Sequence, residues 1–255
     1  TRRARRYPLP LMPSSGAKTP AVSILVPAYN EKDTIREVIE RLLALKINQQ
    51  VVVVNDGSTD GTDDILREFG DQIVFVDNPD PGGKGKAIRA GLPFCTGTAV
   101  IIQDADLEYL PEEIPAVTHP IVEGQSTVVY GSRFMQGMHP SMALPNKIVN
   151  VLLRWAVFVL FGKKLTDEAT CYKAFRRDLL SQMNLTCQRF EFCPEVTAKS
   201  IVLGHQIMEV PISYEPRSKA AGKKIRWTDA PEAFFTLLKH RFWKPESQNE
   251  PSESS

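Results

Sequence analysis

The chain has 255 residues, of which 42% are hydrophobic and 24% are charged, and this composition excludes a disordered or fibrous protein. The formal net charge of +1 excludes nucleic-acid binding through bulk positive charge. The four cysteines form no C-x-x-C pair, which indicates that their thiols are reduced and that the chain lies in the cytosol.

The N-terminal segment and the longest apolar stretch bear on targeting. Residues 1–20 are basic and proline-rich and contain no apolar core, so we expect a flexible arm and no signal peptide. The apolar stretch 149–162 is interrupted by Asn150 and Arg154 and is shorter than the roughly 18 residues that cross a bilayer. We therefore expect no membrane-spanning segment.

Strands and helices alternate along the first half of the chain. Apolar or β-branched runs predict strands at 21–27, 51–54, 73–76, 100–102 and 128–130. Helical spacing of apolar residues predicts helices at 33–43, around 65–69 and at 81–90. The second half adds predicted helices at 144–161 and 231–242 and a strand at 206–214. This alternation predicts an α/β fold with a mostly parallel central sheet flanked by helices.

An acidic motif, Q-D-A-D-L-E, follows the strand at 100–102. Asp104 and Asp106 fall at the carboxyl end of that strand, where open α/β sheets bind ligands. In an extended segment their side chains point the same way, and Glu108 follows at the same period. Such oxygen donors suit Mg²⁺ or Mn²⁺ held against a diphosphate, whereas an isolated Asp-x-Asp triplet is more often a solvated turn.

Other loops that follow predicted strands carry polar groups suited to a nucleotide. Glu31 and Asp56 could accept hydrogen bonds from a ribose or a base, although as isolated residues each would more often cap a helix or form a turn. The glycine-rich segment 82–86 has neither P-loop nor dinucleotide-binding spacing. This disfavours an ATPase or a dehydrogenase.

Five motifs in order carry a family resemblance: V-S-I-L-V-P-A-Y-N-E, V-V-N-D-G-S-T-D-G-T, G-K-G-K-A-I-R-A-G, Q-D-A-D-L-E and G-S-R-F. Over residues 21–226 the chain resembles a family 2 glycosyltransferase with the Rossmann-like GT-A fold of nucleotide-diphospho-sugar transferases. It is most similar to the polyprenyl-phosphate branch, the dolichol-phosphate mannose synthase-like enzymes. The resemblance implies inverting transfer of a hexose from a UDP- or GDP-linked sugar to a polyprenyl or dolichyl phosphate, with Mg²⁺ or Mn²⁺.

The resemblance carries several residues over to the donor. It places around the nucleotide sugar Pro27, Tyr29, Glu31, Asp56, Lys84 and Asp104. Arg217 and Lys223 belong to a basic segment that resembles the loop closing over the phosphates. A cationic loop that contains glycine would become ordered when the ligand arrives.

The resemblance also implies the metal ligands and the catalytic groups. Asp104 and Asp106, with Glu108 where relatives often have Gln, would hold the metal that neutralises the departing nucleoside diphosphate. Asp106 therefore counts among the catalytic residues. Arg133 of the G-S-R-F motif would face the reacting phosphate region.

The nature of the acceptor decides whether a base is needed. Asp167 opens a block similar to the family's Asp-x-x-x-Gly-Phe-Lys/Arg, with Cys171 and Tyr172 in place of Gly and Phe. A lipid phosphate is already an anion at neutral pH, so a cation such as Arg133 would matter more than a base. A sugar hydroxyl must lose its proton, and then Asp167 or Glu168 would be the base.

Three other functions stay open. Metal-dependent transfer to a sugar hydroxyl is the enzyme alternative, and a catalytically inactive nucleotide-sugar-binding module is the alternative of another class. The retained Asp104 and Asp106 pair, with Arg133 and Arg217, weighs against the inactive module. A nucleotidyltransferase is disfavoured because residues 22–31 lack the glycine-rich signature of such enzymes.

We expect four segments, a flexible arm at 1–20, a catalytic domain at 21–226, an amphipathic helix at 227–244 and a polar tail at 245–255. Helices near 149–161 and 233–243 have apolar and aromatic faces flanked by Lys and Arg, which is typical of helices at a membrane interface. Core packing is the equal alternative for the first of them. The prediction is a peripheral protein at the cytosolic face of a membrane, with a membrane partner protein as a further option.

Overall fold

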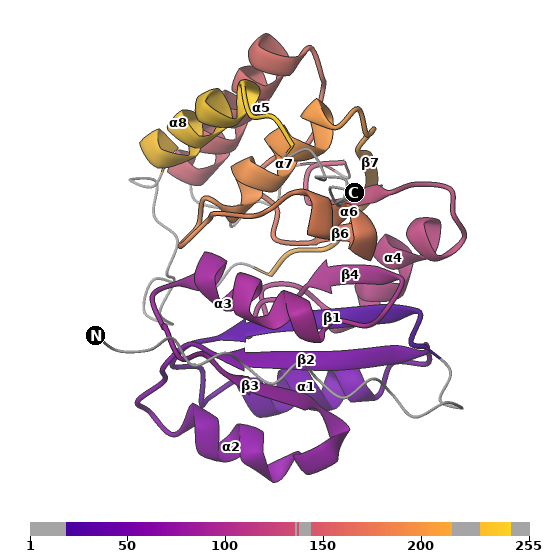
Figure 1. The fold of residues 1–255 in the computed structure, drawn as a ribbon, viewed down its shortest axis with the longest axis vertical. Coiled ribbons are helices and arrows are strands. Elements are labelled where there is room, and N and C mark those ends of the chain that lie inside the picture. The colour runs from indigo at the N-terminus through magenta and orange to yellow at the C-terminus, as the bar shows by residue number, and fades with distance from the viewer. Residues whose placement is uncertain (1–18, 136, 138–143, 216–229, 246–255) are drawn as a thin grey trace, which may run out of the picture.

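The computed structural model of the chain describes residues 19–135, 137, 144–215 and 230–245. Within these residues a seven-stranded sheet has the order β3-β2-β1-β4-β6-β5-β7 (Figure 1). The strands are β1 Val22–Ala28, β2 Gln49–Asn55, β3 Val74–Asp77, β4 Ala99–Ile102, β5 Val128–Ser132, β6 Lys173–Arg176 and β7 Met208–Pro211. Only β6 runs antiparallel to its neighbours in this sheet. The prediction of an α/β fold with a mostly parallel sheet is confirmed.

Helices cover both faces of the sheet. They are α1 Ile35–Leu43, α2 Thr62–Glu68, α3 Lys84–Gly91, α4 Ile114–Val122, α5 Leu144–Phe161, α6 Arg177–Gln182, α7 Phe192–Val202 and α8 Ala230–Arg241. Short 3-10 turns lie at η1 Gly70–Gln72, η2 Leu92–Phe94 and η3 Pro111–Glu113. The core on one face includes side chains of α1, α2 and α4, and the core on the other face includes those of α3, α5, α6, α7 and α8.

The buried strands explain the continuous apolar runs in the sequence. Along β1, Ile24 and Val26 belong to the core on the α1 side, and Leu25 belongs to the core on the α3 side. Along β2, Val53 and Val52 divide in the same way. Because successive side chains point to opposite faces and both faces are covered, every position of these strands favours an apolar residue.

Sequence patterns did not predict β6, α4, α6 and α7. The strand β6 has only two apolar residues, Ala174 and Phe175, between its charged ends. The helix α4 contains Pro120, which obscures its periodicity. Eight of the eleven residues of α7 are buried, including Glu195 and Lys199, so its sequence shows no polar face. The predicted strand at 206–214 is confined to β7.

The helix α5 has the bounds that were predicted for it, and it extends beyond the apolar stretch 149–162. It has 18 residues with a mean hydropathy of 1.4, and by length and composition alone it could cross a membrane, which corrects our expectation that no segment is long enough. The two polar residues that interrupt the apolar run face the protein. The Arg154 Nε donates to the Leu165 carbonyl oxygen at 2.8 Å, and the buried Asn150 Oδ1 accepts from the Ala169 N–H at 3.3 Å.

Some predicted features lie outside the described residues. These are the arm up to residue 18, the polar tail from residue 246, and the basic segment with Arg217 and Lys223.

Candidate active site

The loops that follow four parallel strands meet at one edge of the sheet. The Asp56 N–H after β2 donates to the Ala28 carbonyl of β1 at 2.8 Å. The Asn78 N–H after β3 donates to Asn55 at 2.9 Å, and the Gln103 N–H after β4 donates to Leu25 at 3.0 Å. The groups predicted to contact the donor therefore converge at the carboxyl end of the sheet.

The loop after β1 holds the predicted residues Tyr29 and Glu31, just beyond Pro27. Tyr29 is 47% exposed at the edge of the site. The Glu31 N–H donates to the Thr62 Oγ1 at 2.9 Å, and the Glu31 carboxylate accepts from the Thr34 hydroxyl at 3.2 Å. The first contact holds the loop after β1 against α2, and the second lies within the loop itself.

Asp56 lies under the glycine-rich loop rather than at the surface. Its buried carboxylate accepts from the Asn78 side-chain amide at 2.7 Å and from the Gly83 N–H at 2.7 Å. The Gly82 N–H lies 3.3 Å from the same carboxylate. The turn-forming alternative thus accounts for these bonds of Asp56, and its contact with a nucleotide stays a prediction.

Lys84 opens α3 and reaches across to the acidic motif. Its ammonium donates to Asp104 and also lies 3.2 Å from the Cys171 sulfur. Burial lowers the pKa of Lys84, but the carboxylate of Asp104 outweighs burial, and the pKa lies well above its ordinary value. A fixed positive charge therefore lies beside Asp104 at the edge where the donor diphosphate is predicted.

The acidic motif follows β4 in a bent segment of the chain. The bend begins at Ala105, between the two aspartates, so the extended period of two that was expected to align Asp104, Asp106 and Glu108 does not hold here. The Glu108 carboxylate accepts from the Tyr214 hydroxyl at 3.0 Å, and no group of three metal-binding side chains occurs among the described residues. Mg²⁺ is commonly held by one or two carboxylates together with substrate phosphates, and the metal role of Asp104, Asp106 and Glu108 stays a prediction.

Arg133 and Asp167 form a buried ion pair beside the rings of Tyr109 and Tyr214. The Arg133 Nε and Nη2 donate to the two Asp167 carboxylate oxygens at 2.7 and 2.9 Å, and the Arg133 N–H adds a bond at 3.1 Å. Burial lowers the pKa of Arg133, but Asp167 and its other neighbours raise it well above the ordinary value. Asp167 is placed to orient Arg133, and its part in the chemistry stays a prediction.

Three tyrosines distant in sequence line this region, and of these only Tyr172 lay in a motif that the sequence analysis singled out. The Tyr172 hydroxyl donates to the Gln103 side chain, and the Tyr109 hydroxyl accepts from the Cys171 N–H at 3.1 Å. The Arg133 guanidinium lies 5.0 Å from the Tyr214 ring centre. Burial raises the pKa of all three phenols, so each stays protonated and serves as a hydrogen-bonding partner.

The side chain of Glu209 supports the loop that carries Asp167. The Glu209 carboxylate of β7 accepts from the Thr166 N–H at 2.8 Å and from the Asp167 N–H at 3.0 Å. Because Glu209 and Asp167 are distant in sequence, only the parallel pairing of β7 with β5 reveals this contact.

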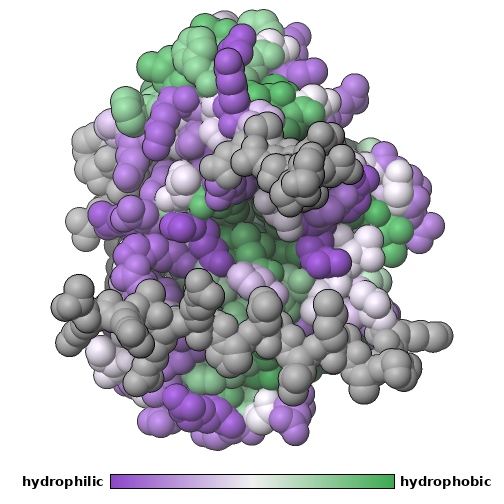
Figure 2. Space-filling view, viewed as in Figure 1, coloured by the Kyte–Doolittle hydropathy of each residue, from purple (hydrophilic) through white to green (hydrophobic). Residues whose placement is uncertain are grey.

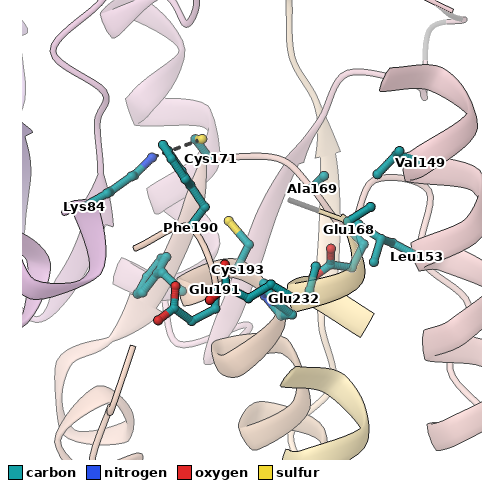
Figure 3. Close-up of a pocket in the computed structure, with 14 residues that line it drawn as sticks. Lys84, Val149, Leu153, Glu168, Ala169, Cys171, Phe190, Glu191, Cys193 and Glu232 are labelled. Atoms are coloured by element: carbon teal, nitrogen blue, oxygen red, sulfur yellow. Dashed lines mark hydrogen bonds between the residues drawn. The ribbon is translucent and has the colours of Figure 1, made fainter. Parts of the chain in front are cut away.

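A cavity of about 90 Å³ extends from Lys84 beneath α5 and α8 (Figure 3). Lys84 and Cys171 lie at one end, and Leu153 and Glu168 lie at the other. Most of the lining is apolar. Glu168 is fully buried, and burial raises the pKa of its carboxyl. Its Oε2 has no hydrogen-bond partner among the described residues.

Comparison with known proteins places this arrangement in a family. The model of the family described as "Glycosyl transferase family 2" matches residues 23–183. The chain belongs to glycosyltransferase family 2. The motifs that carried the resemblance lie within or next to the matched residues.

Curated relatives of this family 2 chain include transferases with a named lipid-phosphate substrate. It is 30% identical over 198 residues to glycosyltransferase AglJ of Haloferax volcanii, an alignment that covers 77% of the chain and 64% of the relative. It is 30% identical over 215 residues to the undecaprenyl-phosphate 4-deoxy-4-formamido-L-arabinose transferase of Pseudomonas fluorescens. This alignment covers 79% of the chain and 59% of the relative. The chain therefore spans about three fifths of the length of these relatives.

Solved structures confirm the GT-A-like fold. The glucosyl-3-phosphoglycerate synthase of Mycobacterium tuberculosis in complex with UDP superposes with a TM-score of 0.67 at 21% identity, over 87% of this chain and 80% of that chain. The same enzyme with Mn²⁺, UDP and phosphoglyceric acid gives a TM-score of 0.67 at 20% identity, over 89% and 80%.

Proposed function

We propose that this protein moves a hexose from a nucleoside-diphosphate sugar to a polyprenyl phosphate, with inversion, at a membrane surface. The observation that carries the proposal is the cavity between the donor-side Lys84 and the helices α5 and α8. One end adjoins the proposed donor site at Lys84, where an acceptor phosphate would meet the donor sugar, and the walls beneath α5 and α8 are apolar. A phosphate attached to a hydrocarbon chain matches both features.

The proposed donor site is the carboxyl edge of β1 to β4. Asp104 and Asp106 would hold Mg²⁺ or Mn²⁺, which when bound neutralises the departing diphosphate. Lys84 adds a fixed positive charge beside Asp104. The solved relatives support this, since their complexes contain UDP with Mn²⁺ or Mg²⁺.

A lipid phosphate needs cations rather than a base at the acceptor side. Both carboxylate oxygens of Asp167 accept bonds from Arg133. In the proposed reaction Asp167 therefore orients Arg133, and the guanidinium faces the reacting phosphates. The curated relative from Pseudomonas fluorescens, named as an undecaprenyl-phosphate transferase, supports this choice of acceptor.

The outer faces of α5 and α8 are the proposed membrane contact. Hydrophobic residues gather at the end of the molecule formed by these helices (Figure 2). The exposed large apolar side chains there are Leu144, Ile148, Val151, Leu152, Trp155, Phe158, Val159, Phe235, Leu238 and Phe242. The exposed Lys163 and Lys164 follow α5, and an apolar face with flanking cations is typical of an interfacial helix. The proposed location is the cytosolic face of a membrane.

One observation favours transfer to a sugar hydroxyl as a second candidate function. The Oε2 of Glu168 is buried at the cavity without a hydrogen-bond partner among the described residues, and burial raises the pKa of this carboxyl, which makes it a stronger base than an exposed glutamate. Glu168→Gln would abolish transfer to a hydroxyl and would leave transfer to a phosphate largely intact.

The test is transfer of radiolabel from a panel of UDP- and GDP-sugars, with Mn²⁺ and a short polyprenyl phosphate, followed by extraction into organic solvent. We expect label in the organic phase with one donor. Asp106→Asn is expected to remove it, whereas Asp71→Asn, which changes an exposed carboxylate in η1, is the matched control that retains it. Label that stays aqueous with every donor, despite measurable nucleotide binding, would contradict the proposed acceptor.

A further inference from the structure

A four-residue loop, Thr186 to Arg189, lies between α7 and the glycine-rich start of α3. Two glutamates of the α7 N-terminus hold this loop by its backbone. The Glu195 carboxylate accepts from the Thr186 N–H at 2.8 Å and the Cys187 N–H at 2.7 Å. The Glu191 carboxylate accepts from the Gln188 N–H at 2.6 Å and the Arg189 N–H at 2.8 Å. Four consecutive amides are thus bound by two carboxylates.

The other side of the loop caps α3. The Gln188 carbonyl accepts from the Lys86 N–H and the Arg189 carbonyl from the Gly85 N–H, both at 2.9 Å. Amides in the first turn of a helix have no partner within the helix, so the 186–189 loop supplies partners for two of them. These are the amides of the two residues that follow Lys84.

Glycine is required for this backbone contact. A Cβ on Gly85 would lie 2.8 Å from the Cys187 carbonyl carbon, and a Cβ on Gly83 would lie 2.9 Å from the Gln188 oxygen. Backbone atoms at such distances cannot move aside without shifting the loop. The glycine-rich motif therefore serves, at these positions, to let α3 approach the 186–189 loop.

We propose that Glu191 and Glu195 are positioning residues for the donor site, which hold the 186–189 loop so that it fixes Lys84 beside Asp104. The inference rests on the proposed function, because it takes the Lys84 ammonium as a donor-phosphate group. Lys84 lies between two glycines and reaches Asp104 from the first residue of α3. Loss of the cap at Gly85 and Lys86 releases the turn that carries this side chain.

Glu191 is the better of the two for a test. Glu195 is 1% exposed, and its carboxylate also accepts from the Lys199 ammonium at 2.6 Å, so its replacement disturbs the core. Glu191 is only half-buried at the N-cap of α7. In Glu191→Gln the side chain keeps one acceptor oxygen, which retains one of the two hydrogen bonds to the loop. Its NH₂ group is a donor and cannot accept from the second amide N–H, so that bond is lost.

The experiment compares wild type, Glu191→Gln and the matched control Glu40→Gln, an exposed glutamate on α1. Hydrogen exchange of the Gly85 and Lys86 amides and acylation of Lys84 by a water-soluble anhydride, mapped by mass spectrometry, are measured on the free protein. Titration with Mn²⁺ and UDP, and in parallel GDP, gives donor affinity. A hydrogen bond to a charged group contributes enough that its loss should speed exchange at Gly85 and Lys86 about tenfold.

The expected result is faster exchange confined to the first turn of α3, faster Lys84 acylation and about tenfold weaker nucleotide binding in Glu191→Gln. Unchanged exchange, acylation or binding in the folded variant would overturn the proposal. So would faster exchange spread over the whole chain with a lower melting temperature, since that marks a general structural role. A wild type that binds neither nucleotide would count against the proposed function, whereas exchange and acylation would still decide the role of the loop.

Discussion

Replacing Asp167 by asparagine removes the charge that holds Arg133. The Asp167 side chain is fully buried, and that of Arg133 is 10% exposed, so the remaining guanidinium would be left in the interior without a counter-ion. Breaking a buried ion pair by removing one partner costs about 3–5 kcal/mol. Asparagine keeps one acceptor oxygen, so we expect a loss of about 3 kcal/mol, at the low end of that range.

Urea unfolding followed by circular dichroism measures this loss, with Asp71→Asn as the exposed control. Arg133→Met removes the charge on the other side, and the double variant should recover part of the stability because no buried charge is left unpaired. A change below about 0.5 kcal/mol in Asp167→Asn is what surface substitutions give, and it would refute the assignment of Asp167 as the residue that holds Arg133.

Three further predictions concern the metal, the membrane face and a buried acid. Asp106→Asn should abolish Mn²⁺-dependent turnover while the circular dichroism spectrum stays unchanged; retained activity would remove Asp106 from the metal site. Phe235→Ser with Phe242→Ser should weaken flotation with liposomes about tenfold or more, since each exposed aromatic buries apolar area in a bilayer, and equal flotation would assign the face another role. Burial raises the pKa of Glu168 in the folded protein above the 4.5 of an exposed glutamate, so above pH 4.5 the unfolded chain loses this proton while the folded protein keeps it. Urea unfolding should therefore show wild-type stability falling relative to Glu168→Gln as the pH rises from 4.5 through the raised pKa, and parallel curves would contradict this.

Much of the fold could be predicted because the parallel strands are buried on both faces. An apolar run such as Val51 to Val54, followed by residues with helical spacing, indicates a parallel strand that is covered on both faces. The convergence of Asp56 and Asp104 at one edge followed from the same topology. The strand β6 could not be predicted, since two apolar residues between Lys173 and Arg176 carry no periodic signal.

The contacts within the site needed the structure. The pairing of Arg133 with Asp167 joins two loops that no local pattern connects. The predicted alignment of Asp104, Asp106 and Glu108 assumed an extended chain, whereas the chain bends from Ala105 onward. The loop contacts of Glu191 depend on backbone amides, which leave no trace in the sequence.

The most direct test of the central claim compares two acceptors that differ only in the phosphate. Wild-type protein is incubated with Mn²⁺, the labelled donor that it binds, and either a short polyprenyl phosphate or the matching polyprenol. We predict label in the organic phase with the phosphate alone, unchanged in Glu168→Gln. Transfer to the polyprenol, lost in Glu168→Gln, would contradict the account and establish a hydroxyl acceptor with Glu168 as its base.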